Sequence, residues 1–185
     1  MRVPPLTVTA GALAAVLLLS GCEGDGGDSG SGGDGRDGSG GKRTAAGPCV
    51  LGALAVEVGP VDAAPAAGDL GNVTVTLTNR GDAACTLQGF PGVTLEAGGT
   101  SATVDPGEAA ARRVSVPREG TVSFTIGYTR GAAGEERSLP VKTVRFRLPD
   151  ASETHGFPWS YGEVALRGGG VPEASVSPFQ QTAGD

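Results

Sequence analysis

Residues 72–93 read NVTVTLTNRGDAACTLQGFPGV, and this stretch decides the fold. Its first part alternates valine or leucine with threonine, and a period of two is typical of a strand with one buried face. Residues 79–82 favour a turn, because Asn and Gly adopt a positive φ at little cost. A second short apolar run begins at Cys85. The stretch therefore predicts two strands joined by a polar turn.

Short strand-like segments recur along the rest of the chain, separated by turns rich in Gly and Pro. The candidate strands cover residues 51–58, 72–78, 85–87, 93–96, 110–116, 121–128, 143–148, 162–166 and 175–177. No window of a dozen residues keeps a helical period. Many short strands at near-regular spacing favour an antiparallel sandwich or barrel.

The first 22 residues have the features of an export signal that ends in a lipid attachment site. The apolar run over residues 6–19 is shorter than the roughly 20 residues that a membrane-spanning helix needs. It ends in Leu19-Ser20-Gly21-Cys22, which resembles the lipobox of bacterial lipoproteins. The resemblance implies a signal peptide over residues 1–21 and a diacylglyceryl group, with fatty acids such as palmitate, on the Cys22 thiol. An ordinary secretion signal with an unrelated cysteine is the alternative.

A lipid on Cys22 predicts a location on the outer face of the cell membrane, because two acyl chains anchor a protein stably. Residues 22–47 are dominated by Gly, Asp and Ser and contain almost no apolar side chain. Such a segment cannot bury enough surface to fold, so it predicts a disordered tether. Residues 48–180 are then expected to form one domain.

The composition excludes several classes of partner and cofactor. The formal net charge is -6, whereas a nucleic-acid-binding surface is basic. The chain has one His and no CxxC motif, so neither a metal nor another cofactor is expected. Abundant Ala, Gly, Pro and Arg suit a GC-rich genome such as that of an actinobacterium.

The chain has three cysteines, and an odd number in an exported protein calls for an explanation. Lipidation of Cys22 leaves Cys49 and Cys85, which can pair in an oxidising compartment. A bridge between them would stabilise the fold by roughly 3.5–4 kcal/mol in a chain-entropy model. Two buried free thiols are the alternative, and a metal site would lack further ligands.

A family resemblance rests on three groups of residues. They are Gly47-Pro48-Cys49 before a Leu/Val run, residues 105–110, and residues 79–93 with the pattern N-x-G-x-x-x-C-x-L-x-G-F-P-G-V. Over residues 48–177 the chain resembles the actinobacterial exported proteins called domain of unknown function 4232. The resemblance implies a small β-sandwich with a Cys49–Cys85 bridge and implies no activity. We therefore expect an antiparallel immunoglobulin-like β-sandwich after the tether.

Two short motifs are candidate contact sites. The aromatic cluster at residues 157–161 lies next to His155, and His155, Trp159 and Tyr161 could contact a ligand. In a chain so poor in aromatic residues, packing at one end of the domain is the preferred interpretation, with His155 as a loop residue. The tripeptide Arg80-Gly81-Asp82 matches an integrin-binding motif, but a hairpin turn favours the same residue types.

These observations predict a non-enzymatic envelope lipoprotein that binds or holds another component. Its expected partners are membrane lipid, through acylated Cys22, and an envelope protein or glycan. No catalytic residue is expected, because His155 has no identifiable nucleophile or acid partner. An exported hydrolase-like enzyme and an accessory subunit of another envelope protein are the alternatives.

Replacing Cys22 with Ser tests the anchor. We expect wild-type protein in the membrane fraction and the Cys22→Ser chain in the soluble fraction, because the hydroxyl is not a lipid acceptor. Cell fractionation followed by immunoblotting measures how much of each chain is in the membrane and soluble fractions. A Cys22→Ser chain that stays on the membrane like wild type would contradict the prediction.

Overall fold

The computed structural model describes residues 46–182. The predicted signal peptide, Cys22 and nearly all of the predicted tether lie outside the described residues. A 3₁₀ turn, η1 (Leu51–Ala53), comes first. The strands are β1 (Leu54–Asp62), β2 (Leu70–Asn79), β3 (Cys85–Gln88), β4 (Gly92–Ala97), β5 (Thr100–Pro106), β6 (Arg113–Val116), β7 (Thr121–Thr129), β8 (Ser138–Leu139), β9 (Thr143–Arg147), β10 (Thr154–Pro158), β11 (Val164–Arg167), β12 (Val171–Pro172), β13 (Ala174–Val176) and β14 (Gln180–Gln181).

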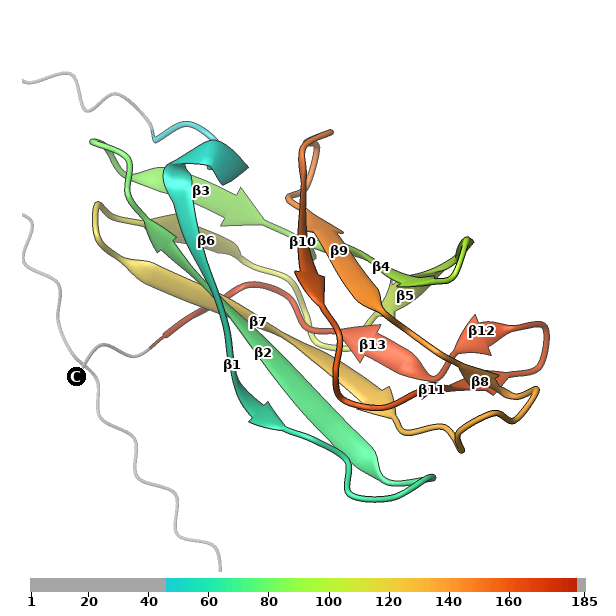
Figure 1. Cartoon of the computed structure of the whole chain (residues 1–185). Helices are drawn as coiled ribbons and strands as arrows, with labels where there is room; N and C mark the ends of the chain where they lie inside the picture. The colour runs from blue at the N-terminus through green and yellow to red at the C-terminus, as the bar shows by residue number, and fades with distance from the viewer. Residues whose placement is uncertain (1–45, 183–185) are drawn as a thin grey trace, which may run out of the picture. The chain divides into compact units, whose positions relative to one another are not determined.

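The all-β prediction is confirmed for this part of the chain. The main sheet has the strand order β1-β2-β7-β13-β5-β4-β9-β10, with β14 also paired to β7 (Figure 1). Two smaller sheets are separate from the main sheet, and their strand orders are β12-β11-β8 and β3-β6. Among residues 46–182, no helix has the length and apolarity to cross a membrane.

The main sheet is mixed rather than antiparallel throughout, which corrects the prediction. Strand β13 runs antiparallel to β7 but parallel to β5, with Ser175 opposite Asp105 and Val176 opposite Pro106. A parallel pair needs a long crossover between its strands. Here the whole segment from β6 to β12 supplies it.

Strand boundaries follow the predicted alternation where the pattern is strong and depart from it elsewhere. The strand predicted over residues 51–58 continues as β1 to Asp62, so Gly59-Pro60 lies inside it, at a register shift between Val58 and Val61. Proline is tolerated there because β1 is an edge strand and the ladder is already irregular. The prediction missed β5 and β10, as well as the two-residue strands β8, β12 and β14. Strand β5 has one buried residue, Val104, and β10 contains His, Gly and Pro, which are poor strand formers.

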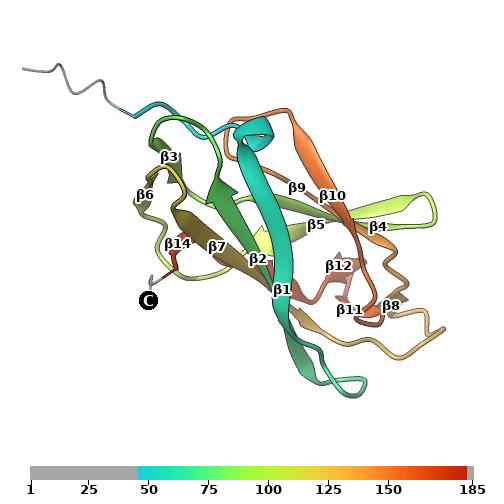
Figure 2. The ribbon, with the colours of Figure 1, turned by 60° about the vertical axis from the view of Figure 1, so that its left-hand side comes forward.

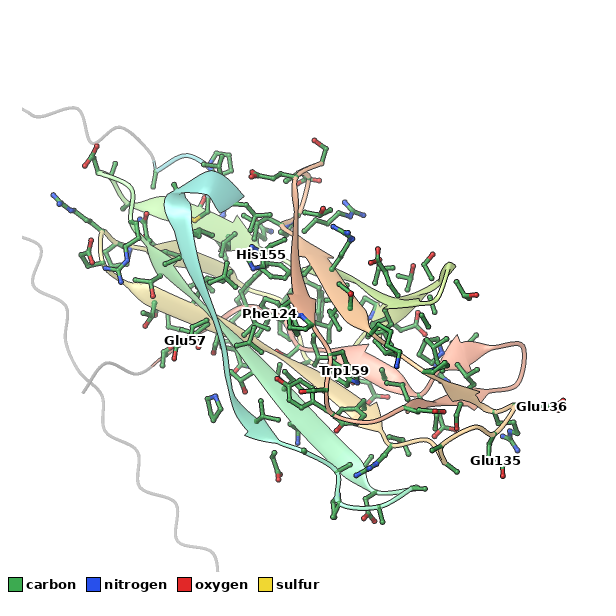
Figure 3. All side chains as sticks on the ribbon, in the orientation of Figure 1. Glu57, Phe124, Glu135, Glu136, His155 and Trp159 are labelled. Carbon is green, nitrogen blue, oxygen red and sulfur yellow. A yellow bond between two sulfur atoms is a disulfide. The ribbon has the colours of Figure 1, made fainter. Side chains whose placement is uncertain are left out.

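The core lies between two halves of the curled sheet. In Figures 1 and 2, β1, β2 and β7 lie on one side and β4, β9 and β10 on the other. The ring centroids of Phe124 in β7 and Phe146 in β9 are 5.2 Å apart, although three strands separate β7 from β9 in the sheet order. Figure 3 shows Phe124 among the inward side chains. Both rings are almost fully buried, so the two halves pack directly against each other.

A disulfide joins Cys49 to Cys85, with 4.9 Å between their Cα atoms. The cysteine count and the family resemblance both predict this bridge. It ties the segment ahead of η1 to the start of β3. Backbone hydrogen bonds from Cys49 N to Thr86 O and from Thr86 N to Gly47 O reinforce the same connection.

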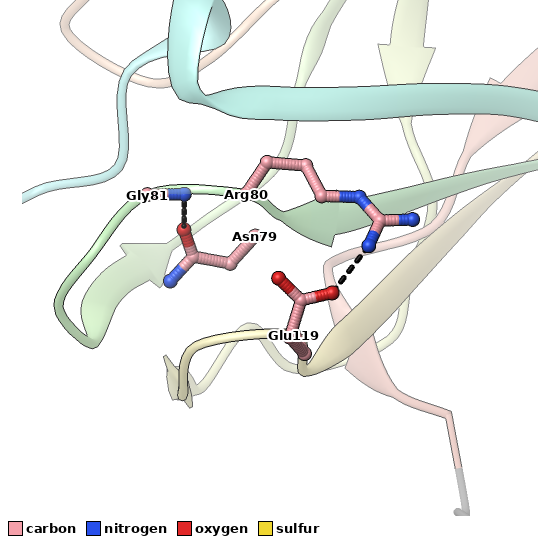
Figure 4. Close-up of polar contacts among 4 residues, drawn as sticks. All are labelled: Asn79, Arg80, Gly81 and Glu119. Atoms are coloured by element: carbon pink, nitrogen blue, oxygen red, sulfur yellow. Dashed lines mark hydrogen bonds and ion pairs between the residues drawn. The ribbon is translucent and has the colours of Figure 1, made fainter.

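Asn79, at the end of β2, is the single buried polar residue among those described. Its Nδ2 donates to the Ala83 carbonyl at 2.9 Å and to the Val116 carbonyl at 3.1 Å. Its Oδ1 accepts from the Gly81 N–H at 2.9 Å, as Figure 4 shows. Its backbone N–H donates to the Gly120 carbonyl. These bonds connect β2, the turn after it, the end of β6 and the turn before β7.

Replacing Asn79 with Ala should destabilise the domain by about 2–4 kcal/mol, because three hydrogen bonds are lost and their partners stay partly buried. The measurement is urea unfolding of a soluble chain, residues 22–185 with Cys22→Ser, since residues 46–182 bury a core of their own. Gln88→Ala is the control. Gln88 bonds Arg113 at the exposed surface, and its loss should change stability by less than about 0.5 kcal/mol. Equal effects of the two substitutions would contradict the role of Asn79.

Candidate functional site

His155 lies in β10 and not in a loop, which corrects the prediction. It pairs in register with Phe146 of β9, and its ring lies 5.4 Å from the Phe146 ring, centroid to centroid. The side chain is half-buried against the core. Strand β10 lies at the edge of the main sheet, and the imidazole of His155 packs beside the Phe146 ring.

Trp159 is only 6% exposed, so the aromatic cluster serves mainly to pack the domain. Its indole packs edge-on against Tyr128 at 5.0 Å and Tyr161 at 4.8 Å, and its Nε1 donates to the Gly162 carbonyl. The Tyr128 hydroxyl donates to the Tyr161 carbonyl and accepts from the Ala64 N–H. Of the three predicted contact residues, Tyr161 and His155 keep partial exposure, and Trp159 offers little surface to a ligand. Figure 3 labels His155 and Trp159.

The tripeptide Arg80-Gly81-Asp82 forms the turn after β2. The Gly81 N–H is bound by Asn79 Oδ1, and the Arg80 guanidinium forms an ion pair with Glu119 (Figure 4). The Arg80 N–H also donates to the Ala53 carbonyl. These contacts give Arg80 and Gly81 a local structural role.

Metal-ligating residues do not gather in the described part of the chain: no group of three or more His, Cys, Asp or Glu side chains there could hold an ion. A groove of about 720 Å³ lies elsewhere in the domain. The start of β2, the end of β7, strand β13 and the residues that follow β5 line it. This volume is within the usual range for small-ligand sites.

The groove lies where β13 joins the two halves of the sheet. Its polar side chains include Asn72 from β2 and Ser175 from β13, on either side of Gly127 of β7. Asp105 and Glu108 contribute carboxylates from the end of β5 and the segment after it, and Arg167 of β11 reaches Asp105 at 3.2 Å. We call this concavity the β13 groove.

Two glycines of the groove have different physical explanations. A Cβ on Gly71 would lie 2.5 Å from the Tyr128 ring and 2.7 Å from the Ala64 nitrogen, so Gly71 is required for packing. A Cβ on Gly127 would meet nothing closer than Asn72 Oδ1 at 3.4 Å, which is an ordinary contact. The absence of a side chain at Gly127 leaves the floor of the groove open.

None of the groove residues was a predicted site residue. The groove depends on the parallel pairing of β13 with β5, which local alternation does not reveal. One signal was present in the sequence: the outward row of β7 reads Thr121, Ser123, Thr125, Gly127 and Thr129, and glycine interrupts it. A strand glycine often marks close approach of a ligand or a backbone.

Comparison with known proteins identifies a family but no characterised relative. The sequence model of a family described as "Domain of unknown function (DUF4232)" matches residues 49–180. No curated protein matches the chain.

Replacing Trp159 with Ala should destabilise the soluble chain by about 3–5 kcal/mol, because a large buried ring and its contacts with Tyr128 and Tyr161 are removed. Urea unfolding measures the change. Trp159→Phe, which keeps a ring in the same site, should cost less. Unchanged stability of the Trp159→Ala chain would show that the indole is not part of the core.

Proposed function

The chain belongs to the domain of unknown function 4232 family, and we propose that it is a non-enzymatic binding module of the cell envelope. In this proposal the lipid on Cys22 anchors the protein at the outer face of the membrane of an actinobacterium. The Gly-, Asp- and Ser-rich residues 22–47 then separate the binding domain from the lipid. The apolar run and lipobox-like residues that end at Cys22 support the anchor.

The proposal also assigns the domain to the immunoglobulin-like sandwiches. In this assignment β1, β2 and β7 form one layer, and β4, β5, β9 and β10 form the other. Contact between Phe124 of the first layer and Phe146 of the second supports it. Loops and strand junctions at the ends of such a scaffold are suited to recognition, because the packed layers hold them in place.

The β13 groove is the observation that carries the proposal of binding. It is open to solvent and combines apolar surface from Leu70 and Pro106 with hydrogen-bonding groups from Asn72, Ser175 and Arg167. An amide, a hydroxyl and a guanidinium bind ligand groups well through hydrogen bonds, and the carboxylates of Asp105, Glu108 and Glu173 add acceptors. This chemistry supports the recognition of a polar ligand.

Site-specific cross-linking on intact cells tests the proposal. A photo-reactive phenylalanine analogue replaces either Leu70, which is 75% exposed at the groove, or Val50, which is 58% exposed outside it. We expect a discrete adduct from position 70 that is absent from position 50, because only a groove-bound partner lies within reach of the first probe. No adduct at position 70, or the same adduct from both positions, would contradict a binding role for the groove.

A further inference from the structure

We propose that the β13 groove contains a subsite over Gly127 that accepts a primary ammonium group of the ligand. The inference rests on the proposed binding function and names the ligand chemistry of the same groove. Three observations carry it: an unfilled position in a strand, the oxygen atoms around that position, and the charge of the groove.

Packing does not require a glycine at position 127, because a larger residue would fit there. Its φ is not in the left-handed region, and an added Cβ would make only ordinary contacts. Its neighbours on the same face of β7 carry hydroxyl side chains that suit a strand. A glycine inside a strand weakens the strand. Since packing does not explain Gly127, we attribute the glycine to ligand binding.

Three oxygen atoms surround this empty position. From the point where a Cβ would stand, Asn72 Oδ1 lies 3.4 Å away, Ser175 Oγ 3.7 Å away and the Ser175 carbonyl oxygen 3.9 Å away. An ammonium group has three N–H donors and no acceptor, and hydrogen bonds from a charged donor are the strong ones. Two of these oxygens, Asn72 Oδ1 and Ser175 Oγ, belong to side chains that line the groove, and they are acceptors of the kind that an ammonium seated outside the Gly127 backbone needs.

The charge of the groove also favours a cationic ligand. Arg167 is paired with Asp105, whereas Glu108 and Glu173 form no ion pair with any of residues 46–182. Carboxylates along one groove raise the local concentration of a cation. A neutral glycan is less well matched, because the one aromatic residue of the lining, Tyr128, is only 2% exposed and offers no ring face for stacking.

The test is an NMR titration of the ¹⁵N-labelled soluble chain with three probes. They are Nα-acetyl-lysine amide, which carries the ammonium, its Nε-acetylated form, which is neutral, and cellotriose, a neutral glycan. We expect the ammonium probe to shift the amide signals of Gly127 and Ser175, with at least about tenfold weaker binding after Nε-acetylation. Added salt should weaken the binding of the ammonium probe.

Gly127→Thr fills the subsite and continues the hydroxyl row of β7. We expect this chain to fold with unchanged or higher melting temperature and to bind the ammonium probe at least about tenfold more weakly. Ser123→Thr, on the same row outside the groove, is the matched control and should bind like wild type.

Several results would overturn the subsite. They are no shift at Gly127 with the ammonium probe, equal shifts with the acetylated probe, a response to cellotriose alone, or full binding by the Gly127→Thr chain. Combining Gly127→Thr with cross-linking from position 70 separates the two proposals. An adduct that persists in that variant refutes the ammonium subsite and leaves the binding function standing, whereas no adduct in the otherwise wild-type chain refutes the binding function itself.

Discussion

The hydrogen bonds of Asn79 are the constraint on which the described domain depends. A buried amide must find partners for its donors and acceptor, or it destabilises the fold. Here the partners come from the turn after β2 and from the end of β6, so the amide is satisfied only when these segments meet. The same turn leads into β3, where Cys85 bonds to Cys49. One polar side chain and one disulfide thus hold the same end of the domain.

The β13 groove does not involve the hydrogen bonds of Asn79. It depends on the parallel pairing of β13 with β5. Strand β13 joins the two halves of the main sheet through only two parallel residue pairs with β5, extended by a hydrogen bond from the Gly107 N–H to the Val176 carbonyl. The end of β5, strand β13 and Gly127 of β7 line the concavity at this junction. A recognition surface at this junction can vary without altering the hydrogen bonds of Asn79.

The small number of aromatic residues limits which side chains the proposed binding site can use. The chain has one Trp, two Tyr and five Phe. Trp159, Tyr128 and four of the phenylalanines are buried in the core. Since a core of this size otherwise rests on Val, Leu and Ala, these rings are needed for packing. Recognition, in the proposed function, would then depend on polar side chains and on a glycine, which is the chemistry that the β13 groove presents.

The sequence by itself predicted the all-β class, the two strands of residues 72–93 and the bridge between Cys49 and Cys85. These predictions follow from local alternation, from turn residues, from the number of cysteines and from the family resemblance. Residues 72–93 do not form a hairpin, because β2 pairs with β1 and β7 and β3 pairs with β6. Only the tertiary structure decided that β13 inserts in parallel beside β5, that His155 lies in a strand, and that Trp159 is buried while Gly127 stays uncovered. Alternation shows which face of a strand is buried, but strand order depends on pairings between distant segments. The groove exists only through such a pairing.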